Sequence, residues 1–335
     1  VIDVRSEAEF AEDHIPGAIN CPVLDDDERA RIGTMYKQVS SFDAKKAGAV
    51  LVSRNIALHL ENTFAQRPRT WRPLVYCWRG GSRSGALAHV MRQIGWRAGQ
   101  LDGGYKAYRR AVIADLGAQP QHYDWRVVCG LTGSGKSRLL RALAQHSAQV
   151  LDLEALAAHR GSVLGDLPGE PQPSQKMLES LVWAELHKFD RAKPVFVEAE
   201  SKKIGNLRVP EALIAAMWSS ACVRLEVPTA LRVTMLRHEY RHFVDDIATL
   251  GIQLDCLNAL HGQERIVEWK ALAAAGDWDA LVRELLEAHY DPAYTRATLK
   301  HFPPHANDVR LAIEADSDDE FDRLAAYCIE NIQGA

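Results

Sequence analysis

Gly130-Leu131-Thr132-Gly133-Ser134-Gly135-Lys136-Ser137 is a stretch that matches the phosphate-loop pattern G-x-x-x-x-G-K-[ST] at every fixed position. Residues 125–129 before it predict a short buried strand, and residues 137–144 predict a helix with apolar side chains at helical spacing. In this arrangement backbone N–H groups and the helix N-terminus bind phosphate oxygens, Lys136 reaches a terminal phosphate and Ser137 reaches a magnesium ion. The alternative is a glycine-rich turn with a chance Lys-Ser pair, which the flanking strand and helix disfavour. We therefore predict a phosphate-ester site formed by Gly130, Thr132, Gly133, Ser134, Gly135, Lys136 and Ser137.

The composition is that of an ordinary globular protein. The chain has 335 residues, of which 47% are hydrophobic and 25% charged, which is enough for two cored domains. No apolar run approaches the roughly 20 residues that span a bilayer, so we expect a cytoplasmic enzyme without membrane association. The six cysteines form no C-x-x-C pair, so neither a zinc site nor a disulfide framework is expected. Because the chain opens at Val1 inside a predicted strand, we expect native residues to precede it.

A candidate reactive cysteine lies in the first third of the chain. Residues 73–76 predict a buried strand that ends at Cys77, and a glycine-containing turn then leads into a helix ending near Ile94. Loop N–H groups, the helix N-terminus, Arg79 and Arg83 would all favour the thiolate, which is the nucleophilic form of cysteine. A buried structural cysteine is the alternative. The two arginines and two glycines that follow Cys77 favour the reactive interpretation.

The first part of the chain resembles the rhodanese fold. The resemblance rests on its opening and closing signatures, Asp3-Val4-Arg5, Glu9-Phe10, His14-Ile15-Pro16-Gly17-Ala18 and Leu101-Asp102-Gly103-Gly104-Tyr105-Lys106-Ala107-Tyr108. It implies that Cys77 stands where rhodaneses carry the persulfide-forming cysteine. The spacing from Cys77 to Arg83 is C-x5-R, one residue longer than in typical sulfur-transferring rhodaneses and like that of related phosphatases. The longer loop implies a wider anion cradle, which suits a phosphate-sized or selenium-bearing donor.

A second set of candidate residues follows a predicted buried strand at residues 193–201. In phosphate-loop proteins the strand beside the loop strand typically ends in an acid that holds magnesium or orients a reacting group. By strand alternation Glu198 and Glu200 share one face, so we predict that one serves a metal and the other a loop or substrate. An exposed strand terminus is the alternative. Lys202 and Lys203 are candidates for contact with a second phosphate or an RNA backbone.

Other charged segments leave two interpretations open. Arg160 lies in a partly basic loop, and Arg237 and Arg241 lie on a predicted helix after a strand at residues 221–228. They are candidate tRNA or phosphate contacts, but a solvated helix face is equally compatible with the pattern. The acidic run at residues 25–28 favours a helix cap over a metal site, because adjacent side chains cannot all face one ion. Residues 277–286 are interpreted as packing, and residues 290–294 as a helix junction without assigned chemistry.

These patterns predict an α/β protein of two domains. We expect an N-terminal rhodanese-like α/β domain at residues 1–117 and a linker at 118–125. A P-loop NTPase-like α/β domain with extra helices and a helical C-terminal part follows at 126–335. The linker is placed where a polar stretch breaks the helical pattern before the phosphate-loop strand.

The whole chain resembles the tRNA 2-selenouridine synthase family. The domain order carries the resemblance, together with Gly103-Gly104-Tyr105-Lys106, Leu151-Asp152-Leu153-Glu154 with His159-Arg160-Gly161-Ser162, and Glu198-Ala199-Glu200-Ser201-Lys202-Lys203-Ile204-Gly205.

The family resemblance implies a two-step exchange on 2-thiouridine at the wobble position of tRNA. Geranyl diphosphate, bound at residues 130–137, alkylates the sulfur, and selenium from selenophosphate then replaces it. Cys77 would carry or deliver selenium, with Arg79 and Arg83 holding the anion. The implied partners are the anticodon region of tRNA and, as a candidate, a selenophosphate-producing enzyme; Mg²⁺ is a candidate ion.

Two other classes of function stay open from the residues alone. In one, an ATP-dependent sulfur-transfer enzyme or kinase uses the phosphate loop for a nucleotide. In the other, the chain is a non-catalytic RNA-binding or regulatory protein with two inactive domains. Intact Cys77, Lys136 and Ser137 disfavour the second, because an inactive copy has no chemical need of them.

Overall fold

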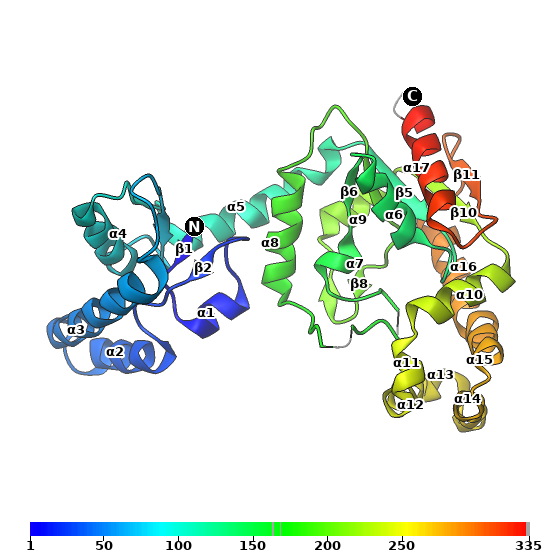
Figure 1. Ribbon diagram of the computed structural model, residues 1–335, viewed down its shortest axis with the longest axis horizontal. Coiled ribbons are helices and arrows are strands. Elements are labelled where there is room, and N and C mark those ends of the chain that lie inside the picture. Colours follow the sequence, from blue (N-terminus) through cyan, green and yellow to red (C-terminus); the bar gives the residue numbers. More distant parts are fainter. Residues whose placement is uncertain (163, 168, 333–335) are drawn as a thin grey trace. The chain divides into compact units, whose positions relative to one another are not determined.

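The computed structural model describes residues 1–162, 164–167 and 169–332. It divides into two compact units (Figure 1), Val1–Asp115 with Pro173–Ala184, and Leu116–Gln172 with Glu185–Ala335. The first unit therefore includes a segment that comes after the phosphate loop in the sequence. Among the described residues no helix has both the length and the apolar character that a membrane crossing requires.

The first unit is built on a four-stranded parallel sheet in the order β2-β1-β3-β4. Its strands are β1 (Ile2–Asp3), β2 (Ile19–Asn20), β3 (Leu74–Tyr76) and β4 (Gly99–Gln100). The helices are α1 (Glu7–Glu12), α2 (Asp26–Gln38), α3 (Ser41–His59) continued by a π-helical turn (Leu60–Phe64), α4 (Ser82–Ile94), α5 (Gly104–Ala118) and α8 (Gln175–Leu186). The predicted strand at the start of the chain, the strand before Cys77 and the helix to Ile94 are confirmed.

Two sequence signatures of this unit have structural roles. Asp25 caps α2, accepting a hydrogen bond from the Glu28 N–H at 2.7 Å, so the acidic run is a helix cap as predicted. Arg5 is buried, pairs with Asp3 at 2.6 Å and lies 3.9 Å from the centre of the Tyr105 ring. The opening signature thus ties β1 to the start of α5.

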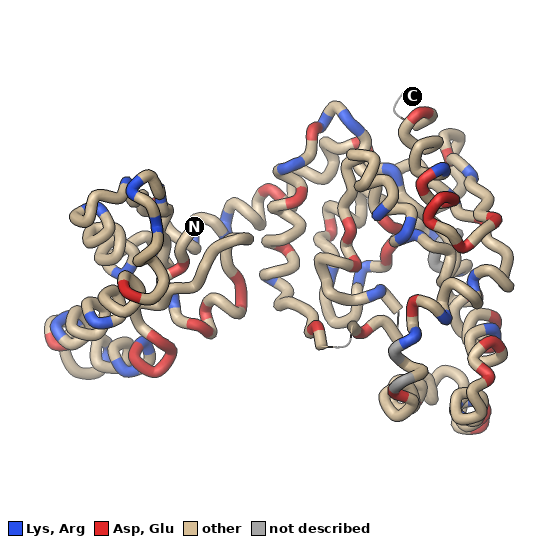
Figure 2. Tube along the Cα trace, viewed as in Figure 1, with Lys and Arg blue, Asp and Glu red and all other residues tan. Residues whose placement is uncertain are grey.

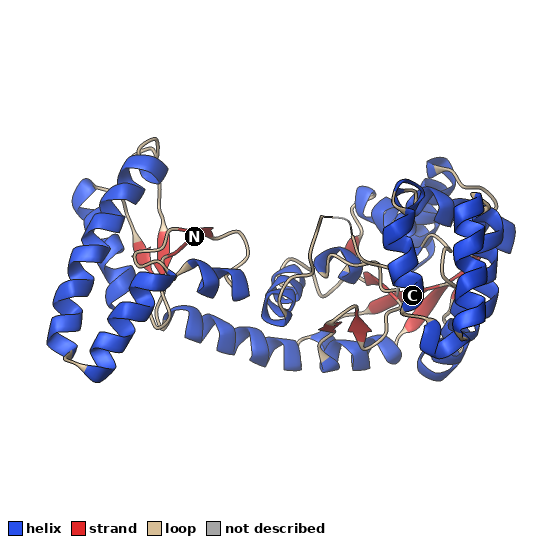
Figure 3. Ribbon diagram, turned by 90° about the horizontal axis from the view of Figure 1, so that it is seen from below, coloured by secondary structure: helices blue, strands red, loops and turns tan. Residues whose placement is uncertain are grey.

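The second unit is built on a five-stranded parallel sheet in the order β11-β10-β5-β7-β6. Figure 3 shows its strands lying between helices. The strands are β5 (Trp125–Cys129), β6 (Gln149–Leu151), β7 (Val195–Glu198), β10 (Ala221–Glu226) and β11 (Val309–Ala312), with a separate antiparallel hairpin of β8 (Lys203–Ile204) and β9 (Leu207–Arg208). The predicted strands at β5, β7 and β10 are confirmed, whereas β11 was not predicted. Because β7 ends at Glu198, Glu200 lies in the following loop, and strand alternation does not relate the two carboxylates.

The helices of the second unit fall into two groups. Around the sheet lie α6 (Lys136–Gln145), α7 (Leu153–Leu156), α9 (Glu211–Trp218) and α17 (Asp318–Ile332), after a short 3-10 turn (Pro120–His122). Between β10 and β11 the chain forms α10 (Thr229–Glu239), α11 (His242–Asp245), α12 (Ile247–Asp255), α13 (Asn258–His261), α14 (Gln263–Ala275), α15 (Trp278–Leu285), a π-helical turn (Leu286–Tyr290) and α16 (Asp291–His301). This helical segment has a core of its own, which includes Leu254, Ile266, Trp269 and Leu281.

Candidate functional site

Cys77 lies just after β3 at the start of a turn that wraps its sulfur in hydrogen-bond donors. The side chain is buried, and the Ser84 hydroxyl donates to Sγ at 3.2 Å. Burial by itself would raise the pKa of the Cys77 thiol. The Ser84 hydroxyl and the backbone N–H groups of Ser84, Gly81 and Arg79 outweigh it and lower the pKa below its usual value. The turn therefore favours a thiolate.

The two arginines predicted to act with Cys77 have different surroundings. Arg79 is exposed. Arg83 is partly buried, and its guanidinium pairs with Glu9 at 3.1 Å. The sequence predicted that both arginines favour the thiolate by charge. In the structure, the interactions that lower the Cys77 pKa come from the Ser84 hydroxyl and the loop N–H groups.

The Cys77 turn is held by the start of α5 and by β4. Gly104 has φ +56°, and a Cβ there would overlap the Cys77 carbonyl oxygen, so glycine lets the two backbones meet. The Tyr105 N–H donates to that carbonyl at 2.9 Å. From β4, the Gln100 amide donates to Ser84 Oγ at 2.9 Å and to the Gly80 carbonyl at 2.5 Å. Ser84 and Gln100 were missed by sequence reasoning; Ser84 could have been found from its place on the first turn of the predicted helix.

The phosphate loop joins β5 to α6 as predicted, and two of its glycines are required by their surroundings. Gly133 has φ +76°, and a Cβ there would lie 2.6 Å from the Leu236 side chain on α10. Gly135 has φ +80°, and a Cβ there would lie 2.5 Å from the Phe321 ring on α17. The loop is therefore confined by helices from two distant parts of the chain.

The polar residues of the loop meet a group of glutamates. Lys136 Nζ donates to the Gly130 carbonyl at 3.1 Å, and Ser137 Oγ donates to Glu154 Oε2 at 3.0 Å. The Glu154 N–H in turn donates to Glu198 Oε1 at 2.7 Å. Burial raises the pKa of Glu198, and burial with the neighbouring Glu154 raises the pKa of Glu200 to about 8. The structure thus gathers Lys136, Ser137, Glu198 and Glu200 around Glu154, which sequence reasoning did not name as a site residue.

The donors in this group are suited to Mg²⁺. The ion prefers oxygen ligands and usually binds through one or two carboxylates together with substrate phosphates and water. Ser137 Oγ and a Glu154 oxygen lie 3.0 Å apart, and Glu198 Oε2 is buried without a hydrogen-bond partner among the described residues. Within the same residues no three His, Cys, Asp or Glu side chains form a ready metal cluster. Ser137 and Glu154 are therefore the protein groups that fit the ion, with phosphate completing the shell.

A segment that the sequence left without chemistry contacts the phosphate loop. The Gly130 N–H donates to the Tyr294 hydroxyl at 3.0 Å. Arg232 on α10 donates to the Thr132 carbonyl at 2.9 Å and to both oxygens of Asp291 at 3.0 and 2.5 Å. The predicted helix junction at residues 290–294 thus carries two residues that fix the loop. Nothing in the local sequence marks a contact with a loop some 160 residues away.

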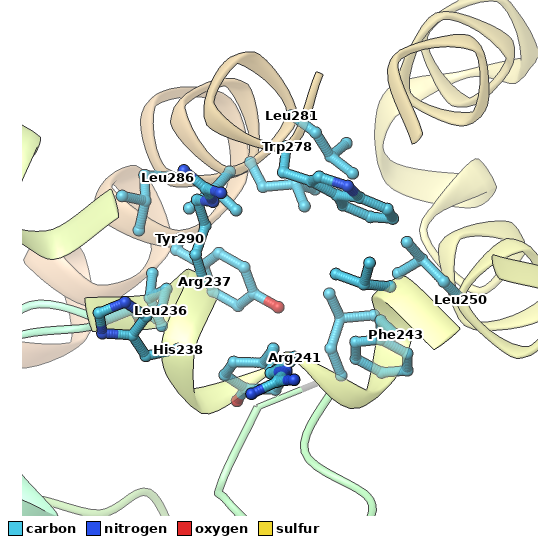
Figure 4. A pocket seen from close by; sticks show the side chains of 16 residues that line it. Leu236, Arg237, His238, Arg241, Phe243, Leu250, Trp278, Leu281, Leu286 and Tyr290 are labelled. Carbon is cyan, nitrogen blue, oxygen red and sulfur yellow. The ribbon is translucent and has the colours of Figure 1, made fainter. Parts of the chain in front are cut away.

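A cavity of about 410 Å³ begins beside the phosphate loop. Figure 4 shows side chains from several helices pointing into it. Its walls are formed by Thr132, Leu164, Leu236, Arg237, His238, Tyr240, Arg241, Phe243, Val244, Leu250, Trp278, Leu281, Val282, Leu285, Leu286 and Tyr290. Five of these residues lie in the segment 277–286 that the sequence interpreted only as packing.

Comparison with known proteins gives the family. Residues 123–251 match the profile described as "tRNA 2-selenouridine synthase AAA domain", and residues 1–111 match "Rhodanese-like domain". Over 247 residues the chain is 36% identical to the tRNA 2-selenouridine synthases of Nitrosomonas europaea and Aeromonas salmonicida, covering 72% of this chain and 63% and 65% of theirs. The enzyme of Bdellovibrio bacteriovorus is 35% identical over 253 residues, covering 72% of this chain and 64% of its own. The chain belongs to the tRNA 2-selenouridine synthase family.

The family assignment confirms the predicted resemblance and fold class, a rhodanese-like region followed by a P-loop-like α/β region. This member of the tRNA 2-selenouridine synthase family spans slightly less than two thirds of the length of the relatives it matches, 63% to 65% for these three. The profile of the second region ends at residue 251, so α13 to α17 and β11 lie beyond it. Glu154, Arg160, Glu198 and Glu200 all fall inside it.

The remaining predicted contact residues of this family member come from three parts of the sequence. Arg160 is partly buried and lies 4.9 Å from the Tyr240 ring centre. Lys202 lies 5.2 Å from the Trp218 ring centre, and Lys203 is exposed on β8. Arg237 and Arg241 are exposed and line the cavity, Arg237 also pairing with Asp279 at 2.8 Å. Lys and Arg are interspersed with Asp and Glu along both units (Figure 2), and contact of these residues with tRNA stays a prediction.

Proposed function

We propose that this chain is a tRNA-modifying transferase that replaces the sulfur of 2-thiouridine at the wobble position with selenium, through an S-geranylated intermediate. One observation carries the proposal: the chain holds two anion-binding loops of different chemistry. One places the Cys77 thiol among N–H and O–H donors that lower its pKa, and the other is a phosphate loop with Lys136 and Ser137. Membership of the tRNA 2-selenouridine synthase family supports tRNA as the substrate. We place the reaction in the cytoplasm as part of the proposal.

In the first proposed step the thiocarbonyl sulfur attacks C1 of geranyl diphosphate. A C–S bond forms, the C1–O bond breaks with its electron pair going to diphosphate, and N3 of the base releases its proton. The loop N–H groups and Lys136 bind the leaving diphosphate, whose charge grows as the bond breaks. Mg²⁺ held by Ser137 and Glu154 would supply further positive charge to that group.

In the second proposed step selenium from selenophosphate displaces the alkylated sulfur. A C–Se bond forms at C2, the C–S bond breaks, and geranyl thiolate leaves with the electron pair. Water then cleaves the Se–P bond, phosphate leaves, and N3 regains a proton. We assign selenophosphate to the Cys77 loop, with Arg79 and Arg83 beside it, and a selenophosphate-producing enzyme as a candidate partner.

Nucleoside mass spectrometry tests the proposal. Thiolated tRNA is incubated with the full chain, geranyl diphosphate and selenophosphate, and each donor is omitted in turn. We expect a geranylated nucleoside with the first donor alone and a selenium-containing nucleoside when the second is added. Unchanged tRNA, together with saturable ATP hydrolysis in a parallel assay, would instead support a nucleotide-using enzyme.

Two variants test the division between the loops. Cys77→Ala should keep geranylation, because the phosphate loop is intact. It should lose selenium incorporation, because the loop assigned to selenophosphate is altered. Lys136→Ala should lose geranylation, because the leaving diphosphate loses its cation. Equal loss of both steps in both variants would show that the two loops do not divide the reaction in this way.

A further inference from the structure

The cavity beside the phosphate loop has walls that are mostly hydrocarbon. Of its sixteen lining residues, ten are aliphatic or aromatic side chains without a hydroxyl, two are tyrosines and one is threonine. The remaining three are Arg237, His238 and Arg241. Walls of this kind stabilise an apolar chain by removing it from water. They offer few hydrogen-bond partners to a nucleotide base, whose polar groups are costly to bury without them.

The cavity is continuous with the loop. Thr132 belongs to both, and its carbonyl is fixed by Arg232 at 2.9 Å. Leu236, another wall residue, packs against Gly133 of the loop. Figure 4 shows Phe243, Leu250 and Trp278 on the side of the cavity away from Leu236 and His238. A diphosphate on the loop would therefore carry its organic chain past Leu236 towards Trp278.

From this continuity we propose that the cavity binds the isoprenoid chain of a prenyl diphosphate. The inference rests on the proposed function for the diphosphate at residues 130–137. Its additional content is the location of the chain and the wall residues that contact it, chiefly Trp278 and Val282.

The volume of the cavity is sufficient for the chain. An apolar cavity of about 150 Å³ holds a benzene molecule, which has six carbons, so each carbon needs about 25 Å³. Ten carbons then need about 250 Å³. The cavity of about 410 Å³ accommodates them. Trp278→Ala removes an indole that the chain would contact and should weaken its binding, whereas Val282→Phe should exclude the chain by filling the space.

Calorimetric binding to the full chain tests the inference without tRNA. The ligands are inorganic diphosphate and geranyl diphosphate. We expect the wild-type chain to bind geranyl diphosphate at least about tenfold more tightly than inorganic diphosphate. Trp278→Ala and Val282→Phe should each weaken binding of geranyl diphosphate about tenfold. Tenfold corresponds to about 1.4 kcal/mol.

Inorganic diphosphate is the internal control for folding and for the loop, and its affinity should stay constant in all variants. Leu260→Ala is the matched control, because Leu260 is 70% exposed on the same helical segment and lies outside the cavity wall. Geranyl diphosphate binding no tighter than inorganic diphosphate would overturn the inference. So would ligand preferences that are unchanged in both cavity variants. Prenyl diphosphate binding that behaves as expected while tRNA is never geranylated would instead leave the inference standing and overturn the proposed function.

Discussion

The hydroxyl of Ser84 is the side-chain group that most directly stabilises the Cys77 thiolate, so Ser84→Ala should raise the Cys77 pKa. The hydroxyl donates to Sγ at 3.2 Å, and Gln100 donates to its oxygen at 2.9 Å, which leaves its hydrogen for Sγ or for the Gly81 carbonyl. Alanine removes this donor. The backbone N–H groups of Arg79, Gly81 and residue 84 itself remain.

The size of the effect follows from these contacts. A hydrogen bond to a charged group contributes about 1.5–3 kcal/mol, and one pKa unit corresponds to about 1.36 kcal/mol. Loss of one of the four donors should therefore raise the Cys77 pKa by about one to two units. The pH at which half of Cys77 is ionised should rise by the same amount.

The assay is the rate of alkylation of Cys77 by iodoacetamide between pH 5 and pH 10, followed by mass spectrometry of the Cys77 peptide. All variants carry Cys256→Ser, because Cys256 is the exposed cysteine of the six and would otherwise react with iodoacetamide. Ser82→Ala is the matched control, since Ser82 is an exposed serine in the same turn. An unchanged Cys77 pKa in Ser84→Ala, or an equal shift in Ser82→Ala, would refute the assignment of the donor.

Two further predictions concern the phosphate-loop region. Burial and the neighbouring Glu154 raise the pKa of Glu200 from 4.5 to about 8, so between these values the folded chain holds a proton that the unfolded chain releases. The free energy of unfolding should therefore fall as pH rises through this window, by at most about 1.4 kcal/mol per pH unit for this proton, and Glu200→Gln should make denaturation midpoints measured from pH 5 to pH 8 less dependent on pH. Gly135→Ala combines a left-handed residue with a Cβ 2.5 Å from the Phe321 ring and should cost about 2–5 kcal/mol of unfolding free energy in denaturant titrations. Gly117→Ala, a helical position with open space around it, should change stability by no more than about 1 kcal/mol, and an equal loss in both variants would contradict the packing argument.

The sequence predicted those parts of the fold whose signal is local. The strand, glycine loop and helix around residues 125–145 are adjacent in the chain, so spacing alone identified them. β11 escaped prediction because it has only four residues, alternates weakly in burial and depends on pairing with β10 for its place in the sheet. β7 was predicted three residues too long at its end, because the apolar pattern does not show where ladder hydrogen bonds stop.

The site followed the same division between local and distant contacts. Cys77 and Lys136 stand in motifs and were predicted. Ser84 is one residue beyond the recognised turn, and Gln100 reaches it from another strand, so no spacing rule connects them. Tyr294 meets Gly130 across 164 residues, and only the packing of α16 brings it there.

The helical segment between β10 and β11 supplies the contacts and the cavity walls that distinguish this phosphate loop. A strand, glycine loop and helix can bind any phosphate ester, because backbone N–H groups and one lysine do not read the organic part of the ligand. Arg232 and Tyr294, which fix the loop, and most walls of the neighbouring cavity come from this one helical segment. Substrate choice and loop geometry are therefore coupled through the same helices. A change at Trp278 should weaken binding of the apolar chain while leaving the loop contacts of Arg232 intact. A change at Asp291 should instead weaken binding of every diphosphate, because it removes the ion pair that holds Arg232 on the Thr132 carbonyl.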